Sequence, residues 1–116
     1  MLNDYNVMGR LAADPELRST PEGTHVCSFV ICCDRDRTTS DGERKTDFID
    51  AVAWAGAAEF IKKHFHKGQL VAANGRMQSR LWEDSSGTTR KSTELSIEHI
   101  YFAGSKKENN EGTESN

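Results

Sequence analysis

The sequence has no long hydrophobic run: no stretch approaches the roughly 18–20 apolar residues that a membrane-spanning helix requires. The N-terminal residues Met1 to Asp4 also lack the basic segment and apolar run of a secretory signal. Neither sign of charge dominates, because 15 Lys and Arg residues and 18 Asp and Glu residues give a formal net charge of −3. We therefore expect a soluble, cytoplasmic protein with no membrane partner. Because the net charge is slightly negative, we do not expect long-range positive charge to be the main attraction for any binding partner.

Cysteine is scarce, and its spacing disfavours both a disulfide framework and a metal site. The three cysteines, Cys27, Cys32 and Cys33, form no C-x-x-C pair. Cys32 and Cys33 are neighbours in a predicted strand and therefore point to opposite faces, so they do not ligate one ion together. We expect reduced thiols that pack as small hydrophobic side chains, with no metal or other cofactor.

Recognisable catalytic motifs are absent as well. The sequence contains no Walker-type phosphate loop, no H-E-x-x-H, no G-x-S-x-G and no carboxylate pair within a known catalytic motif. Only scattered histidines and cysteines would suit a metal-dependent nuclease. We therefore expect a protein that is not an enzyme and has no catalytic residues.

The length of 116 residues is typical of a single domain. Residues 105–116 contain no aromatic or β-branched aliphatic residue that could pack, which predicts a disordered polar tail. The folded domain is expected to occupy residues 1–104.

Alternating apolar residues predict five strands before this tail. They are expected at residues 6–11, 25–33, 48–54, about 69–82 and about 90–102. The second of these strands is apolar on both faces and is therefore expected to be central. The polar block of residues 34–45, with its Asp-Gly turn signal, predicts a long hairpin between the second and third strands.

One short helix is predicted between the third and fourth strands. Its apolar positions recur at intervals of three and four residues and are Ala57, Phe60, Ile61 and Phe65. Gly68 is expected to end it as the C′ residue. This order of elements is that of an all-β OB-fold, a five-stranded Greek-key barrel used to bind oligonucleotides and oligosaccharides.

Trp82 stands out because a tryptophan beside polar residues loses hydration without an obvious packing gain. It lies near the tip of the last predicted hairpin, two residues after Arg80. An indole beside a guanidinium can stack a nucleobase while the cation neutralises a phosphate, and stacking contributes about 1–3 kcal/mol per base. Alternatively, Trp82 folds back onto its own hairpin.

Phe48 and Trp54 form a second aromatic feature. They are six residues apart, so a regular strand projects both from one face, together with Asp50 and Val52. Periodicity alone leaves open whether these rings fill the barrel or a subunit interface, or bind a ligand.

Basic residues are interleaved with the aromatics on both predicted hairpins. They are Arg35, Arg37, Arg44, Lys45, Arg76, Arg80, Arg90 and Lys91. Acidic residues alternate with them and lower the local potential, so any phosphate contact is expected to be short-range and only modestly salt-dependent. A solvated charged surface without a ligand is the alternative.

Several segments, taken in order, carry a family resemblance. They are Val7-Met8-Gly9-Arg10-Leu11, Asp14-Pro15-Glu16-Leu17-Arg18, Thr46-Asp47-Phe48-Ile49, Val52-Ala53-Trp54 and Gly75-Arg76-Met77-Gln78-Ser79-Arg80, with Trp82. With them, the chain from Met1 to about Phe102 resembles the bacterial single-stranded DNA-binding protein family.

The resemblance implies an OB-fold that assembles into a homotetramer, is nucleoid-associated, and binds single-stranded DNA with little sequence preference. Such binding protects the strand during replication, recombination or repair. By the same resemblance, Phe48, Trp54 and Trp82 correspond to stacking aromatics, and Arg76 and Arg80 lie in the basic strand before the second hairpin. The expected DNA-binding residues are Phe48, Trp54, Trp82, Arg35, Arg37, Arg44, Arg76, Arg80 and Arg90.

Two features depart from the family's pattern. Near Asp36 or Arg37 the family usually carries a further aromatic, so we expect weaker binding, partly compensated if Arg35 or Arg37 stacks through its guanidinium plane. The last three residues, Glu114-Ser115-Asn116, lack the proline and phenylalanine through which family tails recruit replication and repair proteins. Recruitment through these last residues is therefore not expected. Two explanations stay open: the sequence is truncated, or it is a mobile-element or otherwise specialised relative that protects strands without recruiting the usual partners.

The acidic balance and the missing hairpin aromatic slightly favour a second interpretation of the same fold. In it, the chain is a primosome-like OB-fold module that binds a protein and has reduced DNA binding.

Overall fold

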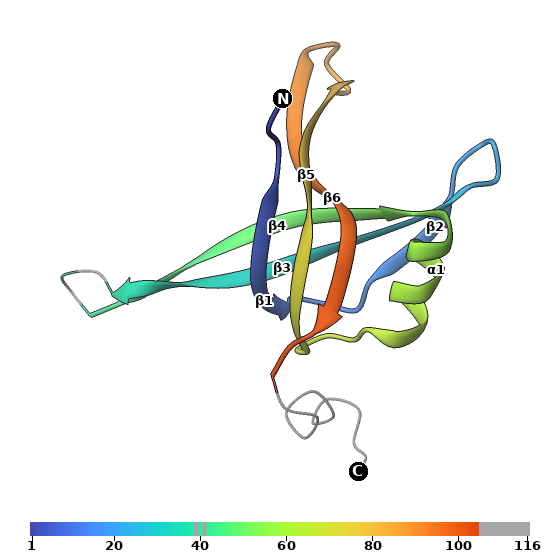
Figure 1. Ribbon diagram of the computed structural model, residues 1–116. Helices are drawn as coiled ribbons and strands as arrows, with labels where there is room; N and C mark the ends of the chain where they lie inside the picture. The colour runs from blue at the N-terminus through green and yellow to red at the C-terminus, as the bar shows by residue number, and fades with distance from the viewer. Residues whose placement is uncertain (39, 41, 105–116) are drawn as a thin grey trace.

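The computed structural model describes residues 1–38, 40 and 42–104, and the side chains of residues 37 and 38 are outside this description. Within these residues there are six strands and one helix (Figure 1). They are β1 (Tyr5–Leu11), β2 (Glu16–Ser19), β3 (His25–Thr38), β4 (Arg44–Trp54), α1 (Ala55–His64), β5 (Leu70–Glu83) and β6 (Thr89–Phe102).

Five of the strands close into a barrel in the order β1-β5-β6-β4-β3, and the pairing of β1 with β3 completes the ring. Strands β4 and β6 are parallel, whereas the other neighbours are antiparallel. This arrangement confirms the predicted OB-fold, with its five-stranded barrel and one short helix. The remaining strand, β2, is not part of the ring. It lies between Pro15 and Pro21 and pairs with β3 at the sheet edge, where prolines are tolerated.

The first hairpin contains more strand than the sequence predicts. β3 continues to Thr38 and β4 begins at Arg44, so both enter the polar block of residues 34–45. A ladder of backbone hydrogen bonds does not require apolar side chains where both faces of the ribbon meet solvent. Cross-strand polar pairs also join the two strands there, as between Asp34 and Thr46 (2.7 Å).

The helix differs from the prediction at its end and on its buried face. It ends at His64, and Phe65 is extended, with φ −114° and ψ 141°. Gly68 is therefore not a C′ residue. It has a φ of 88° in the turn before β5, and its N–H donates to the Leu11 carbonyl at 2.8 Å.

Among the described residues, no helix is long and apolar enough to cross a membrane.

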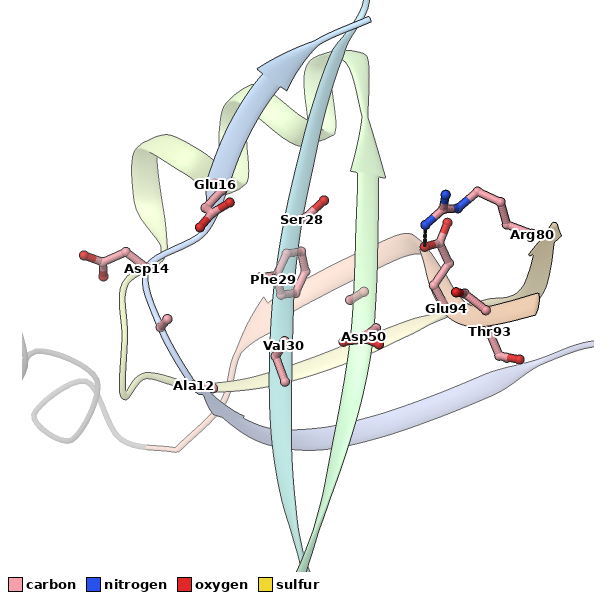
Figure 2. Close-up of a pocket in the computed structure, with 13 residues that line it drawn as sticks. Ala12, Asp14, Glu16, Ser28, Phe29, Val30, Asp50, Arg80, Thr93 and Glu94 are labelled. Atoms are coloured by element: carbon pink, nitrogen blue, oxygen red, sulfur yellow. Dashed lines mark ion pairs between the residues drawn. The ribbon is translucent and has the colours of Figure 1, made fainter. Parts of the chain in front are cut away.

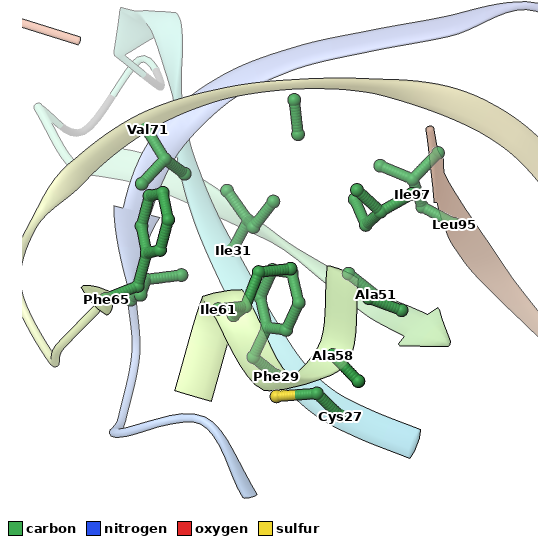
Figure 3. Packing of buried hydrophobic residues seen from close by; sticks show 13 residues of the cluster. Cys27, Phe29, Ile31, Ala51, Ala58, Ile61, Phe65, Val71, Leu95 and Ile97 are labelled. Atoms are coloured by element: carbon green, nitrogen blue, oxygen red, sulfur yellow. The ribbon is translucent and has the colours of Figure 1, made fainter. Parts of the chain in front are cut away.

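The buried face of α1 consists of Ala58 and Ile61, whereas Ala57 and Phe60 are exposed, contrary to the prediction. Ala58 and Ile61 pack against the inward residues of the barrel strands, as Figure 3 shows. The barrel residues labelled there include Cys27, Phe29, Ile31, Ala51, Val71, Leu95 and Ile97. Burial of this apolar surface is the main favourable contribution to the fold.

Only one cysteine packs in the core, although all three were expected to behave as core residues. Cys27 is buried, whereas Cys32 and Cys33 are half-buried. Burial raises the pKa of the Cys27 thiol above its usual value because desolvation disfavours the thiolate.

Candidate nucleic-acid interface

The outward face of β4 carries two large exposed rings. Side chains alternate along the strand, so Ala51 and Ala53 are buried in the barrel while Phe48 and Trp54 point outward. The Phe48 side chain is 67% exposed and that of Trp54 is 45% exposed. The interpretation that they fill the barrel core is therefore wrong.

The strand register extends this outward face across β3 and β2. Trp54 is paired with Val26, and Val26 is paired with Arg18, so the three share one row of the sheet surface. The Arg18 guanidinium donates from Nη1 to the Ser28 hydroxyl at 2.8 Å. Sequence reasoning did not identify Arg18 or Ser28 as site residues, because only the pairing of β2 with β3 brings them to the aromatic face.

The same face continues in the other direction onto β6 and β5. Val52 is paired with Ser96 of β6, and Ser96 is paired with Arg76 of β5. From Arg76, every second residue of β5 lies on this face, which brings Arg80 and Trp82 to the same side of the second hairpin. Figure 1 shows this β5–β6 hairpin extending away from the barrel, in a different direction from the long β3–β4 hairpin.

Trp82 is attached to its own hairpin through the edge of its ring. The indole Nε1–H donates to the Ser92 hydroxyl at 2.8 Å, and the side chain remains 42% exposed. The hydrogen bond holds the ring in one orientation without burying it. Contact with its own hairpin and an exposed ring surface are therefore compatible.

Three of the predicted arginines are paired with carboxylates. Arg35 donates to both oxygens of Asp47, at 2.9 and 3.1 Å, and this contact raises the pKa of Arg35 and lowers that of Asp47. The ion pairs of Arg80 with Glu94 and of Arg90 with Asp84 measure 3.9 and 2.8 Å. Their charges are therefore partly neutralised before any ligand arrives.

The remaining predicted arginines differ in their surroundings. Arg44 donates from Nη1 to the backbone oxygen of Arg35 at 3.2 Å. Arg76 is exposed, and its guanidinium makes no ion pair within the part of the chain that the structure describes. Arg37 lies in β3, but its side chain is outside the described residues, so its predicted contact stays a prediction.

The tip of the second hairpin is organised by Asp84. Its carboxylate accepts from the Ser86 hydroxyl, the Arg90 guanidinium and the backbone N–H groups of Ser86 and Thr88, at 2.7–3.0 Å. These contacts, with the Ser86 hydroxyl foremost, lower the pKa of Asp84 from 3.8 to about 2. The turn that follows Trp82 is therefore built around a stably ionised carboxylate.

A hollow of about 340 Å³ opens on the aromatic face between the β3–β4 sheet and the second hairpin. Figure 2 shows Arg80 and Glu94 on one side of it, Asp50 beside Val30, and Asp14 with Glu16 on the other side. In the described ranges, no three His, Cys, Asp or Glu side chains are grouped as metal ligands would be. The hollow thus offers carboxylates, one guanidinium and a few hydroxyl groups.

Comparison with known proteins agrees with this geometry. The model of the single-strand binding protein family matches residues 2–103. Single-stranded DNA-binding protein 2 of Listeria monocytogenes is 39% identical over 116 residues, which cover 100% of this chain and 72% of that protein. Single-stranded DNA-binding protein A of Bacillus subtilis is 40% identical over 102 residues, which cover 88% of this chain and 59% of that protein. With its barrel and its match along nearly the whole described region, the chain belongs to the single-strand binding protein family.

Proposed function

We propose that this chain binds single-stranded DNA with little sequence preference and protects it during replication, recombination or repair. The observation that carries the proposal is the exposure of Phe48, Trp54 and Trp82 on one continuous face of the sheet. Large rings that are already exposed lose little packing energy when DNA binds. Each base that stacks on them contributes about 1–3 kcal/mol to the binding free energy. The family membership and the names of the relatives support the same ligand.

The proposed mechanism is differential binding. Unpaired bases present their flat faces to the three rings, whereas bases inside a duplex are already stacked and paired. Binding therefore stabilises the single strand against reannealing and against nucleases. Arg76 and Arg44 contact phosphates in this scheme, and Arg18 extends the cationic surface beside Trp54.

The names of the relatives give no support to the alternative of a protein-interaction module, and we propose no catalytic role.

We further propose that residues 1–104 form the DNA-binding domain and that it acts in the cytoplasm as a homotetramer. Exposed apolar side chains on the outer surface of the barrel support an assembly through sheet faces, because Met8 (58% exposed) and Tyr101 (61%) share a row with Ala72. The predicted polar tail, residues 105–116, lies outside the described residues, and we propose no recruitment of partners through it.

Fluorescence titration with oligo-dT, combined with light scattering, tests binding and assembly together. Alanine in place of Phe48, Trp54 or Trp82 is expected to weaken binding about tenfold each, because each variant loses one stacking surface. Leu81→Ala is the matched control, since Leu81 is 69% exposed but projects from the opposite face of the same hairpin. Unchanged affinity in all three aromatic variants of an assembled protein would overturn the proposal, as would duplex DNA that competes equally with oligo-dT.

A further inference from the structure

Asp50 is an unusual residue for a surface that binds a polyanion. It lies on β4 between the two exposed rings, two residues after Phe48 and four before Trp54, and points to the same side. Its carboxylate is exposed and makes no hydrogen bond or ion pair among the residues that the structure describes. An unpaired negative charge here repels phosphates. If it contributes to binding, it does so through the bases.

The neighbouring carboxylate, Glu94, has different surroundings. Its Oε2 accepts from the Gln78 amide at 3.0 Å, and its Oε1 lies 3.9 Å from the Arg80 guanidinium. Only 16% of the Glu94 side chain is exposed. The protein itself therefore satisfies Glu94, whereas Asp50 keeps its acceptor capacity for a ligand.

The position of Asp50 suits contact with the edge of a base. Two residues along a strand span about 7 Å, so the outward positions on either side of Phe48, which are Thr46 and Asp50, are within reach of a base stacked on its ring. Asp50 also lines the 340 Å³ hollow, and its cross-strand partner is the apolar Val30. The Val30 side chain carries no donor, so it leaves the acceptor capacity of the carboxylate to a ligand.

An ionised carboxylate only accepts hydrogen bonds, so it distinguishes bases by the group on their exposed edge. Cytosine and adenine carry an exocyclic amino group, which donates. At the same ring position, C4, thymine and uracil carry the O4 oxygen, which accepts and is repelled by a carboxylate. Their N3–H donates from the adjacent position, so the discrimination requires that the carboxylate contacts the substituent on C4. One such contact in a stacked array biases base composition without creating a strict sequence requirement.

Resting on the function proposed above, we infer that Asp50 is a specificity-determining residue that accepts a hydrogen bond from the exocyclic amino group of a base stacked on Phe48. The chain therefore favours strands containing cytosine or adenine at this position over strands containing thymine or uracil. Asp50 is a binding group for the base edge, and its negative charge is not a general aid to DNA binding.

The test compares oligo-dC with oligo-dU of equal length, because the two bases have the same size, lack the thymine methyl group and differ on the edge that carries the amino group or O4. Dissociation constants are measured for the full chain and for Asp50→Asn, which keeps the side-chain size but removes the charge and adds a donor. We expect Asp50→Asn to lower the preference for oligo-dC over oligo-dU about fivefold. Glu83→Gln is the control, since Glu83 projects from the opposite face of the second hairpin.

The outcomes are distinct. In Glu83→Gln, the ratio of the two dissociation constants stays at the value of the unsubstituted chain. If Asp50→Asn tightens binding to both oligonucleotides equally, Asp50 acts only through its charge and the inference is wrong. If the unsubstituted chain binds neither oligonucleotide, the proposed function fails and this inference fails with it. Unchanged unfolding temperature and light scattering in both variants show that the assembly is intact.

Discussion

At the scale of single residues, hydrogen-bonding partners decide how the second hairpin presents its side chains. The Ser92 hydroxyl accepts a hydrogen bond from the edge of the Trp82 indole, and the Asp84 carboxylate accepts four hydrogen bonds from groups in and beside the turn. Arg90 is one of these donors, so this predicted DNA-binding residue also belongs to the structure of the turn. The same side chain cannot give its whole charge to a phosphate while it is paired with Asp84.

The pKa of Asp84 leads to a pH-dependent contribution to stability. Because this pKa is about 2 in the folded chain against an ordinary value of 3.8, the stabilisation is present above pH 3.8 and is lost as the pH falls through about 2. Asp84→Asn lacks the ionised group. We expect its deficit in unfolding free energy to be constant between pH 7 and 5 and to shrink below about pH 4.

Denaturant unfolding of both proteins at a series of pH values measures this difference, with Glu83→Gln as the control for loss of one carboxyl group. A deficit that grows as the pH falls would show that the carboxylate contacts are not the source of the stability.

At the scale of the elements, a shift in the register of β5 with β6 separates the barrel half of β5 from its hairpin half. The register with β6 shifts between Asn74 and Gly75, and Gly75 is buried against the backbone of β6. A Cβ on Gly75 would lie 2.0 Å from the Ser96 carbonyl oxygen. Only glycine lets the two strands approach this closely, and the hairpin that carries Trp82 starts from this point.

Gly75→Ala is therefore expected to destabilise the fold by roughly 3 kcal/mol, the upper end of the usual cost of overpacking, because the backbone of β6 has to move. Gly56→Ala in α1 is the matched control, since a Cβ there meets no atom within 4 Å. It should stabilise the helix by roughly 0.5–1 kcal/mol. Thermal or denaturant unfolding of the two variants checks both values. Equal stability of Gly75→Ala and the unsubstituted chain would contradict the close-contact argument.

At the scale of the whole molecule, the charges are balanced rather than concentrated. The formal net charge is −3, and three of the predicted DNA-binding arginines are already paired with carboxylates. An arginine that is neutralised within the protein releases few counterions when it meets a phosphate. Stacking should therefore contribute more to affinity than electrostatics does.

We expect the logarithm of the binding constant for oligo-dT to fall as the logarithm of the salt concentration rises, with a slope of about −1.4 per protomer. Arg44 and Arg76 each contribute about −0.7 to this slope. Titrations at several salt concentrations measure the slope. Arg76→Ala should reduce its magnitude by about 0.7, whereas Arg90→Ala should change it less, since Arg90 is paired with Asp84. A slope steeper than about −4 would show that electrostatics dominates.

Local sequence patterns were sufficient for much of the fold. Alternation predicted β1, β3, β4, β5 and β6, and spacing predicted one helix, because both patterns depend only on neighbouring residues. They also placed Phe48 and Trp54 on one face. The end of the helix and two residues of its predicted apolar face, Ala57 and Phe60, were predicted wrongly, whereas Ile61 and Phe65 are buried as expected. Packing on the barrel, not spacing alone, decides which side of α1 is covered.

Long-range pairing decided the candidate site. The alternating pattern of β4 predicts that Phe48, Asp50 and Trp54 share a face. Which face of the strand is buried in the core depends on pairing with strands that are far away in the sequence. The parallel pairing of β4 with β6 joins the face of Asp50 to that of Arg80 and Trp82, and the pairing of β2 with β3 adds Arg18. Sequence alone therefore determined the five barrel strands and the residue types. The tertiary structure added β2 and decided which side chains of different strands share a surface, because strand register is a property of pairs that no single segment encodes.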